Sequence, residues 1–76
     1  MTLNIKIPNA KTAEKLNKIA TEVDENVWVH SNDGMIMVDA RSLIGLFALV
    51  GEDCHLVAED NADPKILSMI AKKAGI

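Results

Sequence analysis

The feature that most constrains the fold is the repeated change in spacing of the apolar residues along the chain. In LNIKI, Leu3, Ile5 and Ile7 alternate with polar residues, which predicts a strand with one buried face. From residue 10 to residue 23 the spacing becomes three and four, as in an amphipathic helix. Asn9 is its expected N-cap, with Thr12 as the alternative. The expected buried helix face contains Ala13, Leu16, Ile19, Ala20 and Val23.

A hairpin is predicted for residues 27–38, which read VWVHSNDGMIMV. On both sides of SNDG, every second residue is an aliphatic Val or Ile. Asp33-Gly34 suits a turn with positive φ. The expected core side is Val27, Val29, Ile36 and Val38, and the opposite face is Trp28, His30, Met35 and Met37.

The stretch SLIGLFALV, residues 42–50, is almost entirely apolar. Ser42 is a good N-cap, residues 43–49 make a helix of about two turns, and Gly51 suits its end. A two-turn helix cannot bury seven apolar side chains on one face. We therefore expect part of Leu43, Ile44 and Phe47 to be exposed, and Leu46 and Leu49 to lie mostly in the core.

The remaining sequence predicts one more strand and one more helix. In CHLVAED, residues 54–60, the side chains of Cys54, Leu56 and Ala58 share a face. In the final helix Asp63 is the expected cap and Pro64 the first helical residue. Its buried stripe is Ile66, Leu67, Ile70 and Ala74, and Gly75 is its expected end. The order β-α-β-β-α-β-α over residues 1–76 predicts one α+β domain, an open-faced sandwich with helices on one side of a four-stranded antiparallel sheet.

Composition excludes several classes of function. A net charge of -3, with one Trp, one Phe and no Tyr, disfavours nucleic-acid binding. The single cysteine, Cys54, cannot form an internal disulfide and is expected to be a small buried hydrophobe. The acidic residues do not form a calcium loop, so no metal is expected. No signal peptide or membrane-spanning run is recognisable, so the expected location is the cytoplasm.

The element order, the length and the motif VDARSLIGLFAL, residues 38–49, together resemble HPr, the small phosphocarrier family of the bacterial sugar phosphotransferase system. In that family a hairpin strand leads into a basic residue, a serine, two apolar residues and a glycine. Arg41, Ser42, Leu43, Ile44 and Gly45 match this pattern. The resemblance implies the HPr-like fold, in which the second and fourth strands are neighbours.

The resemblance also shows what this sequence lacks. In HPr a histidine begins the first helix and carries the phosphoryl group, and an arginine and a proline follow it. Here Lys11 or Thr12 stands at that position, Ala13 and Glu14 follow, and no histidine precedes residue 30. The chain thus resembles relatives without the phosphohistidine, such as a catabolite-repression paralogue that keeps only a regulatory serine. We expect neither enzymatic activity nor a cofactor.

Ser42 has two interpretations: the family's regulatory phosphorylation site, or a helix cap alone. Arg41, Leu43, Ile44 and Phe47 match the family's docking surface for phosphotransferase proteins or a transcriptional regulator, but they also suit a homodimer contact or a simple cap over the sheet. A genuine phosphocarrier is the third choice for the function.

Trp28, His30 and His55 are expected to share the open sheet face. A histidine pair there has two interpretations, metal binding or pH sensing on one hand and a solvated face on the other. The solvated face is favoured, because only two ligands are present.

Overall fold

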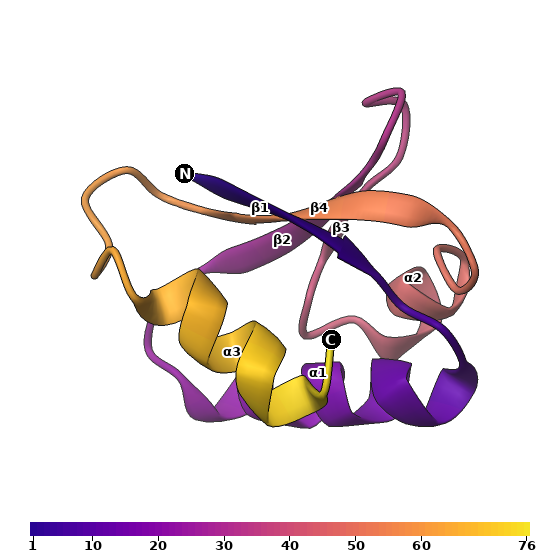
Figure 1. Ribbon diagram of the computed structural model, residues 1–76, viewed down its shortest axis with the longest axis horizontal. Helices are drawn as coiled ribbons and strands as arrows, with labels where there is room; N and C mark the ends of the chain where they lie inside the picture. Colours follow the sequence, from indigo (N-terminus) through magenta and orange to yellow (C-terminus); the bar gives the residue numbers. More distant parts are fainter.

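The computed structural model describes residues 1–76 and places four strands in one antiparallel sheet, with three helices on one side of it (Figure 1). The strand order is β1-β4-β2-β3, so β4 lies between β1 and β2. None of the helices has the length and apolar composition that a bilayer crossing requires. The elements are β1 (Thr2–Lys6), α1 (Ala10–Glu22), β2 (Val27–Ser31), β3 (Met37–Asp39), α2 (Leu43–Phe47), β4 (Asp53–Ala58) and α3 (Ile66–Ala74).

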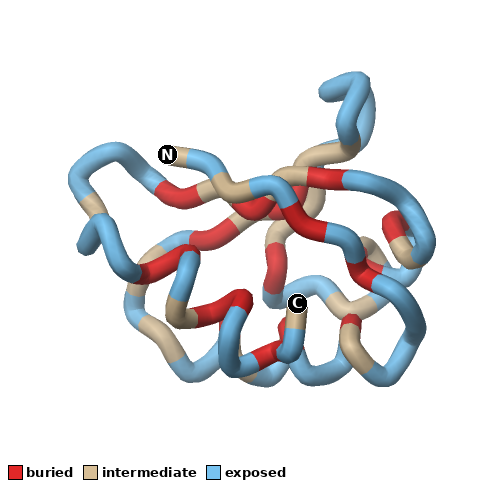
Figure 2. Tube along the Cα trace, in the orientation of Figure 1, coloured by how far each residue is buried: buried red, intermediate tan, exposed pale blue.

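The core lies between the sheet and the helices, as the alternating pattern of the strands predicts. Val27 and Val29 of β2 and every second residue of β4 are buried, and the apolar stripes of α1 and α3 face them (Figure 2). No polar or charged residue is buried, so apolar burial dominates the stability of the fold. The predicted α+β architecture is confirmed. The strands contribute Ile5, Val27, Val29, Cys54, Leu56 and Ala58 to the core, and the helices contribute Ala13, Leu16, Ala20, Leu46, Ile66, Leu67, Ile70, Ala71 and Ala74.

Two of the three helix starts that were predicted from side-chain caps are confirmed. The Asn9 Oδ1 atom accepts a hydrogen bond from the backbone N–H of Thr12 at 2.8 Å, so Asn9 rather than Thr12 is the N-cap of α1. Ser42 is the N-cap of α2. Gly75 takes φ +79 at the end of α3, the left-handed conformation that glycine adopts without strain.

Several boundaries differ from the predicted ones. α2 ends at Phe47, not at residue 49, because the chain tightens there into turns whose N–H groups bond three residues back: Leu49 donates to Leu46, and Val50 to Phe47. α3 begins at Ile66, with Lys65 at the N-cap position. The carboxylate of Asp63 accepts a hydrogen bond from the Lys65 N–H at 2.9 Å. Asp63 therefore shapes the turn before the helix, and Pro64 lies outside the helix.

The hairpin prediction was wrong at Ile36, which is 43% exposed rather than in the core. The β2–β3 connection is longer than a tight turn and projects away from the body of the molecule (Figure 1). Hydrogen bonds inside the loop stabilise it, from Ser31 N–H to the Ile36 carbonyl at 2.8 Å and from Met35 N–H to the Asp33 carboxylate at 3.0 Å. Because β3 begins only at Met37, Ile36 extends beyond the helices that cover the core. Of the turn pair, only Gly34 has positive φ.

Candidate functional site

Ser42 stands at the start of α2, immediately after the turn that follows β3. Its Oγ accepts a hydrogen bond from the Gly45 N–H at 3.3 Å, while its own N–H donates to the Asp39 carbonyl at 2.8 Å. The side chain is otherwise exposed to solvent. The hydroxyl therefore caps the helix through one long hydrogen bond and remains accessible from outside.

Gly45 allows α2 to lie close against β3. A Cβ atom built at this position would be 2.9 Å from the Val38 Cβ and 3.0 Å from the Val38 Cγ1, closer than two carbon atoms approach in van der Waals contact. The glycine in the motif is thus explained by packing of the helix on the sheet, independently of any partner.

The apolar side chains of α2 divide between core and surface. Leu46 is fully buried, and Leu49, just beyond the helix, is buried as well. Ile44 is 83% exposed, Phe47 is 41% exposed, and Leu43 is half-buried. The predicted excess of apolar surface is confirmed. Its use for docking remains a prediction.

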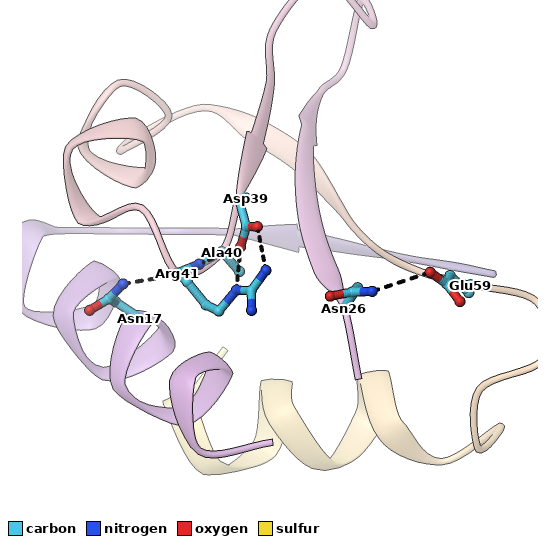
Figure 3. A network of polar contacts seen from close by, with 6 residues as sticks. All are labelled: Asn17, Asn26, Asp39, Ala40, Arg41 and Glu59. Carbon is cyan, nitrogen blue, oxygen red and sulfur yellow. Dashed lines mark hydrogen bonds and ion pairs between the residues drawn. The ribbon is translucent and has the colours of Figure 1, made fainter. Parts of the chain in front are cut away.

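Arg41 is paired with Asp39 rather than extended into solvent (Figure 3). The guanidinium donates from Nε to Oδ1 at 3.1 Å and from Nη2 to Oδ2 at 2.9 Å, and the Arg41 backbone N–H also donates to Oδ1. The hydrogen bonds from the Arg41 side chain, followed by the one from its backbone, lower the pKa of the Asp39 carboxyl, and the pair raises the pKa of Arg41. These contacts hold the Arg41 guanidinium against the Asp39 carboxylate.

The start of α1, where the resemblance to HPr would place a histidine, lies at the same end of the molecule as α2 (Figure 1). Asn17 in α1 donates from Nδ2 to the Ala40 carbonyl at 3.3 Å (Figure 3). Lys11 is exposed, and Thr12 is half-buried with its N–H bonded to Asn9. Neither side chain offers a nitrogen nucleophile comparable to imidazole.

The two histidines lie on the helix-free face and stand directly opposite each other in the β2–β4 pair, as His30 and His55. Trp28 shares this face two residues before His30, so the predicted grouping is confirmed. The His55 Nδ1 atom is 2.7 Å from the Oδ1 of Asn4, its partner in β1. No group of three or more His, Cys, Asp or Glu side chains lies close enough to hold a metal ion.

Comparison with known proteins identifies the fold. A scan against protein-family models finds no match, and a search of curated proteins finds none. Among solved structures, the crystal structure of HPr-C-His from Thermoanaerobacter tengcongensis is similar over 100% of this chain and 97% of its own length. The TM-score is 0.68 and the sequence identity 23%.

The chain has the HPr-like fold. At 23% identity the similarity shows the architecture alone.

Sequence reasoning missed two contacts of the site. Asp39 was not predicted as the partner of Arg41, although an acidic residue two positions before a basic one was visible in VDAR. Asn4 was not connected to His55, because nothing local to either strand indicates which residues will pair across them.

Proposed function

We propose that the protein is a noncatalytic HPr-like module related to the phosphotransferase system, which acts by binding protein partners through the α2 surface. This docking surface consists of Arg41, Leu43, Ile44 and Phe47, with Ser42 at its edge. The single observation that carries the proposal is that Ile44 is 83% exposed on a five-residue helix whose Leu46 is fully buried. An exposed isoleucine beside an exposed phenylalanine favours association with a partner.

The start of α1 supports the absence of carrier activity. Phosphoryl transfer through the family's route needs an imidazole at that helix start, and the available side chains are Lys11 and Thr12. Both histidines lie on strands of the sheet instead.

Ser42 is the position at which phosphorylation would control docking. Its hydroxyl is exposed, and its only hydrogen bond is long. A phosphate at a helix N-terminus is electrostatically favourable. The modification would therefore add charge beside the apolar surface without disrupting the helix.

The carrier question is tested with phosphoenolpyruvate and the first enzyme of the phosphotransferase system. We expect no acid-labile phosphate on this protein, while an authentic HPr in the same reaction becomes labelled. A phosphohistidine at His30 or His55 would overturn the noncatalytic assignment.

The serine switch is tested with an HPr serine kinase and ATP, followed by mass spectrometry. We expect one phosphate on the wild type and none on Ser42→Ala. A wild type that stays unmodified would leave Ser42 as a helix cap only.

The docking surface is tested by calorimetric titration against phosphotransferase proteins and HPr-binding regulators. Ile44→Ser and Phe47→Ser should abolish the heat of binding. Met35→Ser, at an apolar position outside α2 that is as exposed as Ile44, should preserve it. Equal binding by all three variants would exclude α2 as the docking surface.

The alternative function is homo-oligomerisation through the same exposed Ile44 and Phe47. Sedimentation separates the two, because a docking module stays monomeric at high concentration. A dimer that dissociates in the Ile44→Ser variant would favour the oligomerisation module instead.

A further inference from the structure

The helix-free face of the sheet carries a row of four side chains that crosses every strand. Asn4 in β1 is opposite His55 in β4, His55 is opposite His30 in β2, and His30 is opposite Met37 in β3. Residues directly opposite each other have Cβ atoms about 4.5 to 5.5 Å apart. The His55 imidazole is therefore next to the His30 imidazole, and the His30 imidazole is next to the Met37 thioether.

The residues of this row point away from the core. Next to the two histidines along their strands, Val29 and Leu56 are fully buried on the opposite face of the sheet. His30 and His55 are half-buried on the sheet surface, and Met37 is 64% exposed. Both imidazoles and the sulfur are thus accessible from solvent.

The contact with Asn4 favours one arrangement of the His55 ring. The Asn4 amide oxygen is 2.7 Å from His55 Nδ1, and because an amide oxygen only accepts, a hydrogen bond forms there when the proton is on Nδ1. In that tautomer of the neutral ring, the lone pair is on Nε2, the nitrogen that would bind a metal ion. A hydrogen bond to the second ring nitrogen is the arrangement that orients metal-binding histidines.

The donor set is two imidazole nitrogens and one thioether sulfur, without a carboxylate. The nearby Asp33 carboxylate is occupied by the Ser31 hydroxyl at 2.6 Å and by the Met35 N–H. Hard cations such as Mg²⁺ and Ca²⁺ require oxygen ligands. Imidazole binds copper and zinc, and a thioether favours the soft ion Cu⁺.

We propose that His30, His55 and Met37 form a binding site for Cu⁺ on the open face of the sheet, with Asn4 orienting His55. The site is independent of the docking surface, which belongs to the helical side of the molecule. Binding involves no change of oxidation state.

The test is anaerobic titration of the folded protein with Cu⁺ in competition with a chromogenic chelator. The fluorescence of Trp28 provides a second readout, because Trp28 is the only tryptophan and lies on the same face, two residues from His30. We expect one Cu⁺ per chain and quenching of Trp28 that saturates at the same ratio.

Variants assign the three ligands. His30→Gln and His55→Gln should remove stoichiometric binding, and Met37→Leu should weaken Cu⁺ binding while leaving Zn²⁺ binding unchanged. Asn4→Ala should weaken Cu⁺ binding by about tenfold, the usual effect of losing an orienting partner. Met35→Leu is the matched control, since Met35 is 85% exposed but outside the row.

Two outcomes would overturn the site. An equal loss of Cu⁺ affinity in Met35→Leu and Met37→Leu would mean that exposed methionines bind Cu⁺ without the histidines. Weaker binding in Cys54→Ala would assign the ion to the thiol, which is buried on the other side of the sheet and whose pKa is raised by that burial. Circular dichroism of each variant verifies that it is folded.

Discussion

The two faces of the sheet differ in every property except their backbone. The covered face presents aliphatic side chains and Cys54, and is closed by α1, α2 and α3. The open face presents histidine, tryptophan, asparagine and methionine to water. Adjacent residues of one strand therefore differ in role: one side chain stabilises the core, and the next is exposed on the open face and available for binding.

The same division continues in the helical layer. Leu46 and Ile44 are both apolar residues of α2, yet one is fully buried and the other is 83% exposed. A large apolar side chain on the outside of a helix contributes little to the fold. The difference between these positions indicates which substitutions test stability and which test binding.

The largest effect is expected from Leu56→Ala on the covered face. Removing a fully buried leucine costs about 2 to 5 kcal/mol through lost burial and the cavity left behind. The next residue, Val57, lies on the open face, and Val57→Thr should change stability by about 0.5 kcal/mol or less. Urea unfolding of both variants measures the difference, and similar losses would contradict the two-face description.

The second largest effect is expected from Gly45→Ala, which should lower the free energy of unfolding by about 1 to 3 kcal/mol through overpacking. The new methyl group would meet Val38 at 2.9 Å, so α2 would have to move away from β3. The double variant with Val38→Ala should recover part of the loss, because the Cγ1 contact disappears while the Cβ contact remains. Strict additivity in this double-mutant cycle would show that the close approach has no energetic consequence.

A smaller effect is expected from the Asp39–Arg41 pair. The pKa of Asp39 is lowered in the folded state, so its contribution to stability is complete above the unfolded pKa of about 4 and is lost as the pH falls through the folded value. Asp39→Asn should therefore flatten the fall in stability below about pH 4. Thermal unfolding between neutral and acidic pH measures this, and an unchanged slope would mean that the pair makes no contribution.

The smallest effect on stability is expected from Ile44→Ser. An exposed side chain outside the core changes the free energy of unfolding by about 0.5 kcal/mol or less. Leu46→Ala, on the buried side of the same helix, should cost about 2 to 5 kcal/mol in parallel. A large loss in Ile44→Ser would show that Ile44 stabilises the fold and would weaken the docking proposal.

The sequence by itself determined the architecture and the division of α2. Local signals predicted these elements: the alternation in LNIKI and CHLVAED, the helical spacing after Asn9, and the caps at Asn9 and Ser42. The structure contains the corresponding strands and helices. The exposure of Ile44 and Phe47 was also predictable from the number of apolar residues in this stretch, because a short helix cannot bury so many on one face.

Only the tertiary structure decided which distant residues became neighbours. Strand alternation places His30, His55 and Met37 on one face of the sheet. The register that aligns them with Asn4 depends on how all four strands pair. The exposure of Ile36 and the contact between Gly45 and Val38 arise in the same way. Each depends on the position of one packed element relative to another, for which a local pattern of residues carries no signal.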